Sequence, residues 1–142
     1  MRKAEVFLSS FAALACVGLT IYLWGWISTF QPLWPFPALY LIELVLLAFL
    51  AWYFSFRDLP RSAMVIWGIT GVFLAFAILA SFSIGLFYYP FVVFYAAIAL
   101  LVDLRQKRIS WTHIGMLFVG GLVQAALIVL ILQLILQPGS AG

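Results

Sequence analysis

Residues 63–102 read AMVIWGITGVFLAFAILASFSIGLFYYPFVVFYAAIALLV and contain no Asp, Glu, Lys or Arg. A transmembrane helix needs about 20 apolar residues at a rise of about 1.5 Å per residue, so this stretch is about two bilayer crossings long. The small and hydroxyl-bearing residues of SFSIG (81–85) allow a tight turn near its middle. Pro90 then falls in the first turns of the second crossing, where a missing N–H is tolerated best. The stretch therefore predicts a hairpin of two transmembrane helices.

The composition of the whole chain fits the same surroundings. Of 142 residues, 68% are hydrophobic and 8% are charged, with seven basic and four acidic side chains. Soluble domains carry about 25% charged residues, and so few charges could not cover a water-soluble fold of this size. We therefore expect hydrocarbon to surround most of the molecule, with the lipid bilayer as its first partner. Nucleic acid is not an expected partner, because no basic stripe is long enough to follow a phosphate backbone.

Proline-rich or charged segments separate the remaining crossings. QPLWPFP (31–37) holds three prolines, RDLPR (57–61) is short and charged, and DLRQKR (103–108) is the most polar stretch of the chain. The sequence therefore predicts an all-α membrane bundle of five transmembrane helices that forms a single domain over residues 1–142. The predicted spans are 6–28, 37–56, 63–82, 86–102 and 111–136.

The first span has an alternative interpretation as a cleaved signal peptide. Arg2 and Lys3 precede it, and ALA (13–15) matches a cleavage site. Glu5 interrupts the basic leader, however, and the apolar run continues to Ile27. We expect an uncleaved first span.

The basic residues predict the orientation of the bundle. They fall before the first span, between the second and third, and between the fourth and fifth, so five crossings place all of them on one side. Because basic residues stay in the cytoplasm during insertion, we expect the amino terminus inside and the carboxyl terminus outside a cell (plasma or inner) membrane. A model that fused the third and fourth spans would break this pattern. The residues are Arg2, Lys3, Arg57, Arg61, Arg105, Lys107 and Arg108.

Glu43 is the first candidate for a functional side chain. It lies six residues past Pro37, roughly 9 Å below the predicted outer end of its helix. An ionisable group costs about 2.5 kcal/mol or more near the bilayer centre and is a functional candidate by default. One interpretation is a proton- or cation-binding carboxyl in a translocation path. The other is a hydrogen-bonded carboxyl that pins helices together.

Gln124, near the middle of the fifth predicted helix, is the second candidate. Gly120 and Gly121 lie on its stripe, so another helix could approach closely and receive a hydrogen bond from the amide. Packing is the simpler interpretation, and contact with a substrate is the alternative. Gly68 and Gly71 line one side of the third helix and also predict helix packing.

The other polar residues are predicted to have local roles. His113, in the first turn of the fifth helix, is expected to reach toward the membrane interface. Asp103 precedes Lys107 by four residues, an ion-pair spacing on a helix, and Asp58 neighbours Arg57.

No enzyme, cofactor or metal motif stands out in the sequence. HExxH, GxSxG with its partners and a phosphate-binding glycine loop are missing, and the single Cys16 excludes an intrachain disulfide and a CxxC pair. We therefore expect a protein that is not an enzyme and binds no metal or cofactor. The favoured hypothesis is a non-catalytic accessory or packing subunit of a membrane assembly, with other subunits or further copies of itself as partners. The alternative is a small transporter or channel component that uses Glu43.

Overall fold

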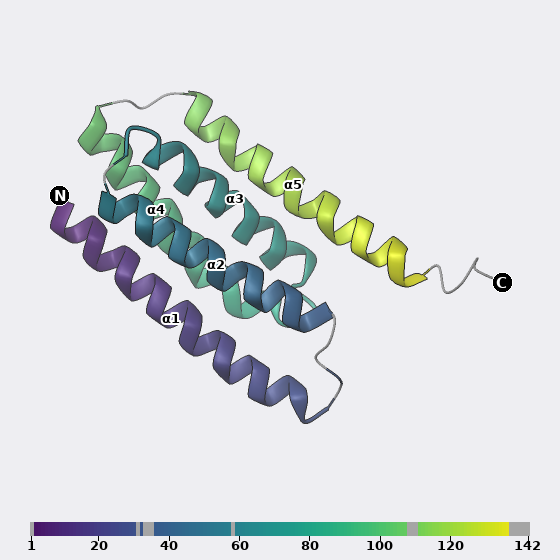
Figure 1. Cartoon of the computed structure of the whole chain (residues 1–142). Helices are drawn as coiled ribbons and strands as arrows, with labels where there is room; N and C mark the ends of the chain where they lie inside the picture. Colours follow the sequence, from purple (N-terminus) through teal and green to yellow (C-terminus); the bar gives the residue numbers. More distant parts are fainter. Residues whose placement is uncertain (1, 31, 33–35, 58, 108–110, 137–142) are drawn as a thin grey trace.

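The computed structural model describes residues 2–30, 32, 36–57, 59–107 and 111–136. Over these residues the chain forms five α-helices and one short 3₁₀-helix, η1 (Gly85–Tyr88), which leads into α4 (Figure 1). Each of the five α-helical segments is long and apolar enough to cross a membrane. The predicted all-helical class and the five helices long and apolar enough to span a membrane are thus confirmed, and these helices are consistent with a membrane location. The α-helices are α1 (Arg2–Ser28), α2 (Phe36–Arg57), α3 (Ser62–Leu79), α4 (Tyr89–Gln106) and α5 (Trp111–Leu136).

The helices pack as an elongated up-and-down bundle with α3 at its centre. Helix α3 contacts α2, α4 and α5, whereas α1 packs on α2 and α4. The most apolar stretch of α3 is 56% buried within the protein, but that of α5 is only 6% buried. Figure 1 shows α5 as the outermost helix along one flank of the bundle. Most of the α5 surface is therefore left for lipid or for another protein.

The helix bounds differ from the predicted ones where polar side chains are bonded between helices. Helix α1 begins at Arg2, before the apolar run, and α4 continues to Gln106. These extensions carry Glu5 and Arg105, which bond to each other and so hold the added turns together. Helix α3 ends at Leu79, three residues earlier than expected.

The turn between α3 and α4 depends on Gly85. Its N–H donates to the carbonyl of Ala80 over 2.8 Å, and a Cβ at this position would lie 2.5 Å from the Ala80 carbonyl carbon. Only glycine leaves room for this closed turn. Pro90 stands at the start of α4, where its missing N–H costs nothing.

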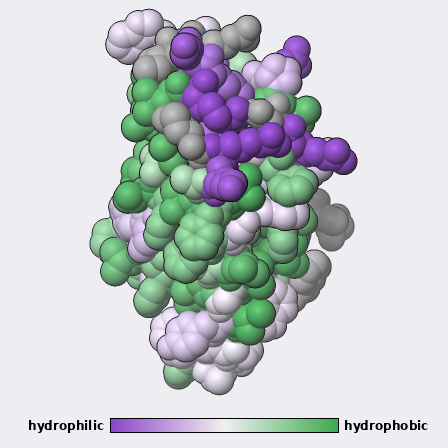
Figure 2. Space-filling view, turned by 90° about the vertical axis from the view of Figure 1, so that its left-hand side faces the viewer, coloured by the Kyte–Doolittle hydropathy of each residue, from purple (hydrophilic) through white to green (hydrophobic). Residues whose placement is uncertain are grey.

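The two ends of the bundle differ in chemistry. Helix α1 begins, α2 ends, α3 begins, α4 ends and α5 begins at one end, which we call the polar end. Figure 2 shows the side on which α1 begins, where hydrophilic residues gather in the upper part and hydrophobic residues cover most of the rest. The opposite, aromatic end carries Trp24, Trp26, Phe30 and Tyr40. The gathering of polar residues at one end matches the distribution of basic residues along the sequence. Which side of the membrane each end faces stays a prediction.

The core combines a small-residue face with a cluster of rings. Ala12 and Cys16 of α1 are fully buried, and the Cys16 thiol lies 3.9 Å from the Leu44 carbonyl oxygen. Phe73 packs on Tyr95 with ring centroids 4.9 Å apart. These contacts bring α1, α2, α3 and α4 together around an interior with few polar groups.

Candidate functional site

Gly71 and Gly120 let α5 approach α3 closely. A Cβ on Gly71 would collide with the carbonyl of Leu117, and one on Gly120 would collide with the carbonyl of Gly68. A Cβ on Gly121 would lie 3.5 Å from the Gly71 oxygen, an ordinary contact. All four predicted packing glycines therefore lie where the two helices meet. This close approach fixes the height and rotation of α5 and hence the position of Gln124.

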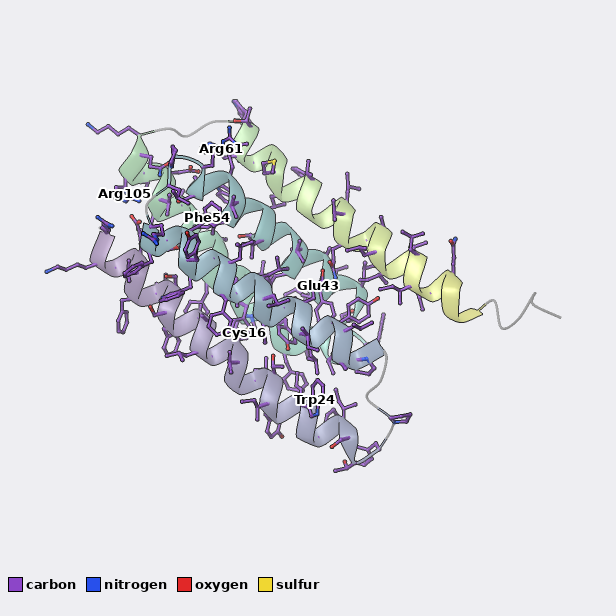
Figure 3. The ribbon with its side chains drawn as sticks, in the orientation of Figure 1. Cys16, Trp24, Glu43, Phe54, Arg61 and Arg105 are labelled. Carbon is purple, nitrogen blue, oxygen red and sulfur yellow. The ribbon has the colours of Figure 1, made fainter. Side chains whose placement is uncertain are left out.

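Gln124 and Glu43 meet between α5 and α2. The Gln124 amide nitrogen donates to a Glu43 carboxylate oxygen over 3.2 Å, a pair separated by 81 positions in the chain. Figure 3 labels Glu43 on α2. Gln124 is only 1% exposed, and its Oε1 has no hydrogen-bond partner among the described residues. Glu43 is half-buried. The two residues singled out from the sequence thus form one acid–amide pair, whose hydrogen bonding is incomplete.

An apolar pocket of about 670 Å³ lies at the aromatic end, and neither Glu43 nor Gln124 lines it. Tyr40 is three residues from Glu43, and Ile128 is four residues from Gln124. Both lie on the aromatic-end side, about 4.5 and 6 Å along their helices. The acid–amide pair therefore sits one helical turn deeper than the pocket on both flanking helices. The pocket is lined by Trp26, Ile27, Phe30, Pro37, Tyr40, Phe76, Leu79, Ala80, Phe82, Ser83, Ile84 and Ile128.

At the polar end, Asp103 is held by donors from two other helices. Its carboxylate accepts from Trp67 Nε1 over 2.8 Å and lies 2.7 Å from His113 Nδ1. His113 is 8% exposed and Asp103 3%, so the prediction of an interfacial histidine reaching outward is wrong. The expected Asp103–Lys107 pairing gives way to these bonds because Lys107 leaves the helix with φ 50° and is exposed. The predicted Asp58–Arg57 pair lies outside the described residues.

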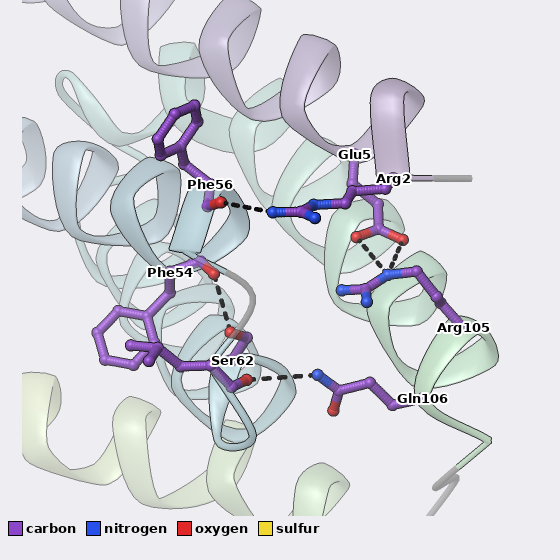
Figure 4. A network of polar contacts seen from close by, with 8 residues as sticks. Arg2, Glu5, Phe54, Phe56, Ser62, Arg105 and Gln106 are labelled. Carbon is purple, nitrogen blue, oxygen red and sulfur yellow. Dashed lines mark hydrogen bonds and ion pairs between the residues drawn. The ribbon is translucent and has the colours of Figure 1, made fainter.

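A second polar-end network joins α1 to α4. Arg105 Nε donates to both carboxylate oxygens of Glu5 over 2.9 and 3.0 Å, and Glu5 is fully buried. Nearby, Arg2 donates to the Phe56 carbonyl, and Gln106 donates to the Leu59 carbonyl (Figure 4). The Glu5–Arg105 bond joins residues 100 positions apart and was not predicted from the sequence. A usable signal was the helical spacing that puts Glu5 on the same face as Ala12 and Cys16.

The three acid sites within the bundle have different chemistry. Glu5 and Asp103 have strong donors at the polar end, whereas the half-buried Glu43 has only an amide donor and lies one helical turn from Tyr40 of the pocket. Within the part of the chain that the structure describes, no three His, Cys, Asp or Glu side chains could hold a metal ion together. Comparison with protein-family models, with curated proteins and with solved structures finds no match. A function is therefore inferred from the geometry of the Glu43–Gln124 pair and of the pocket one helical turn away.

Proposed function

We propose that this multi-pass membrane protein is a small transporter or channel component, without catalytic activity of its own, that binds a proton or cation at Glu43 and Gln124. The observation that carries the proposal is the 3.2 Å hydrogen bond joining the two side chains, one helical turn from Tyr40 and Ile128 of the apolar pocket. An ionisable side chain within a transmembrane segment is a functional candidate by default. Glu43 and Gln124, which are far apart in the sequence, lie together in one site. This proximity favours the transport function over packing alone.

The proposal is tested with protein reconstituted into liposomes that contain a pH-sensitive dye. A potassium diffusion potential set with valinomycin drives proton movement, and the internal pH is followed. Glu43→Gln keeps the shape of the side chain and removes its charge, so we expect proton flux to fall to that of empty liposomes. Glu43→Asp retains a carboxyl group and serves as the matched control. Equal flux through Glu43→Gln and the unmodified protein would contradict a proton or cation role.

The second candidate function is an accessory or packing subunit of a membrane assembly. The observation that favours it is α5, whose apolar stretch is only 6% buried and whose Phe118 and Leu122 are 65% and 70% exposed. A second copy or another membrane subunit could cover this face. Leu122→Cys in a Cys16→Ala background should form a disulfide-linked dimer in native membranes if copies meet there. Purification in mild detergent as a strict monomer with no partner would count against an assembly role.

The membrane orientation belongs to the same proposal. The described basic residues at the polar end support a cytoplasmic amino terminus and an outer carboxyl terminus in the cell membrane. Reporter tags on the two ends should therefore report opposite compartments. Tags in the same compartment would overturn this topology.

A further inference from the structure

We propose that the pocket and the acid–amide pair bind a lipophilic amine, which is a small molecule with an apolar body and one protonated nitrogen. This inference rests on the proposed function and names the class of cation that the site would take. Three features of the site carry it: the pocket, the hydrogen-bond inventory of Glu43 and Gln124, and the distribution of charge.

The pocket fits an apolar body of drug-like size. Its volume of about 670 Å³ lies within the range of about 300–1,000 Å³ that small-molecule sites occupy. Rings from three helices line it, including Trp26 of α1, Tyr40 of α2 and Phe76 of α3. Such rings accept both apolar groups and cations over their faces. A ligand that reaches this pocket from the bilayer needs an apolar body to enter it.

The acid–amide pair needs a hydrogen-bond donor. Glu43 offers carboxylate oxygens, and the buried Oε1 of Gln124 has no partner among the described residues. The Gln124 NH₂ group is the donor in the described bond between them, so acceptors outnumber donors. Flipping the Gln124 amide exchanges the positions of its oxygen and nitrogen and still leaves one of these two atoms without a partner. An ammonium N–H placed between Glu43 and Gln124 would serve both acceptors.

The positive charge has to come from the ligand. The described basic side chains lie at the polar end, where Arg105 pairs with Glu5. No basic side chain lines the pocket among the described residues. A protonated amine would supply the missing charge and form a charge-assisted hydrogen bond with Glu43, which is stronger than a bond between neutral groups. Its apolar body would extend one turn outward to Tyr40 and Ile128.

The test uses the full chain in lipid nanodiscs and dansylcadaverine, a fluorescent aromatic sulfonamide whose alkyl chain ends in an ammonium group. Fluorescence titration should show saturable binding. Glu43→Gln and Gln124→Leu should each weaken it on the order of tenfold, the equivalent of losing one hydrogen bond to a charged group. Gln133→Leu, the same substitution at an exposed position of α5, is the matched control and should leave binding unchanged.

Two altered probes separate charge from hydrogen bonding. The N-acetylated probe has no charge, and the trimethylammonium probe keeps the charge but lacks N–H donors. We expect both to bind on the order of tenfold more weakly than dansylcadaverine. Equal binding of either probe, or equal binding of dansylcadaverine to Glu43→Gln, would overturn the inference. Ile128→Trp fills the pocket without changing the pair, so it tests the same point if Gln124→Leu fails to fold, and unchanged binding to it would also overturn the inference.

Failure of this inference can be told apart from failure of the proposed function. Proton flux that depends on Glu43, with no binding of the amine, would show that the site works but takes another cation. Binding of the amine that depends on Glu43, with no proton flux, would support the amine site and contradict a role in proton transport.

Discussion

The carboxylates at the polar end and the carboxylate of the Glu43–Gln124 pair differ in how completely they are hydrogen-bonded. At the polar end, Glu5 receives two bonds from one guanidinium at 2.9 and 3.0 Å, and Asp103 is bonded to a tryptophan and a histidine. Within α2, Glu43 has one amide donor at 3.2 Å, and the other end of that amide is unpaired among the described residues.

This difference distinguishes carboxylates that stabilise the fold from a carboxylate that can bind a ligand. A carboxylate with charged or strong donors at short distance is held in one arrangement, and its bonds join α1, α3, α4 and α5 at one end. A carboxylate with an incomplete set of partners can exchange them, which a binding site requires. Substitutions at the polar end should therefore cost stability, and those at the acid–amide pair should cost activity.

Arg105→Leu gives the largest expected loss of stability. It leaves the fully buried Glu5 carboxylate without its guanidinium, and breaking a buried ion pair in this way costs about 3–5 kcal/mol. Equilibrium unfolding in mixed detergent micelles would measure the loss. The double variant Glu5→Leu/Arg105→Leu removes both charges and should recover most of it. Equal stability of Arg105→Leu and the unmodified protein would show that the polar end is not held by this pair.

His113→Leu should have the next largest effect. It removes one of the two described donors to the buried Asp103 carboxylate and leaves Trp67 as the other. Loss of a partner for a buried polar group costs about 1–3 kcal/mol. His113→Gln can still donate a hydrogen bond and should be less destabilised, as measured by the same unfolding assay. A greater loss in the glutamine variant would argue against a donor role for the imidazole.

Gly71→Ala tests the helix contact that positions the pair. Its Cβ would collide with the Leu117 carbonyl, so α5 must shift, and overpacking of this kind costs about 1–3 kcal/mol. Gly18→Ala is the matched control, because a Cβ there meets nothing within 4 Å, and it should stabilise α1 by about 0.5–1 kcal/mol. Thermal unfolding and proton flux would both be measured. Normal flux in a destabilised Gly71→Ala protein would show that the site tolerates displacement of α5.

The features predicted from the sequence are those that depend on neighbouring residues. Hydropathy over 63–102 and the turn-forming residues at 81–85 act locally, so the five helices and the hairpin could be derived. The bond between Glu5 and Arg105 joins residues 100 positions apart, and a single sequence carries no direct record of such pairing.

The two residues of the candidate site could be predicted from the sequence, but their contact with each other could not. The cost of burying polar groups singled out Glu43 and Gln124, whereas their contact depends on how α5 packs on α3. The pocket depends on side chains from four helices and has no sequence motif. The expectation for His113 was wrong because the end of one helix was considered without the helices packed beside it.

Gln124→Leu should have the smallest effect on stability and yet a large one on activity. It removes a hydrogen bond worth about 0.6 kcal/mol within a membrane, but it also removes a buried Oε1 that has no partner among the described residues. These changes oppose each other, because burying an unpaired amide oxygen is itself unfavourable. We therefore expect unfolding within about 1 kcal/mol of the unmodified protein, together with strongly reduced flux in liposomes. A stability loss as large as that of Arg105→Leu would place Gln124 with the polar-end bonds, as a structural residue, and would remove the contrast between the two regions.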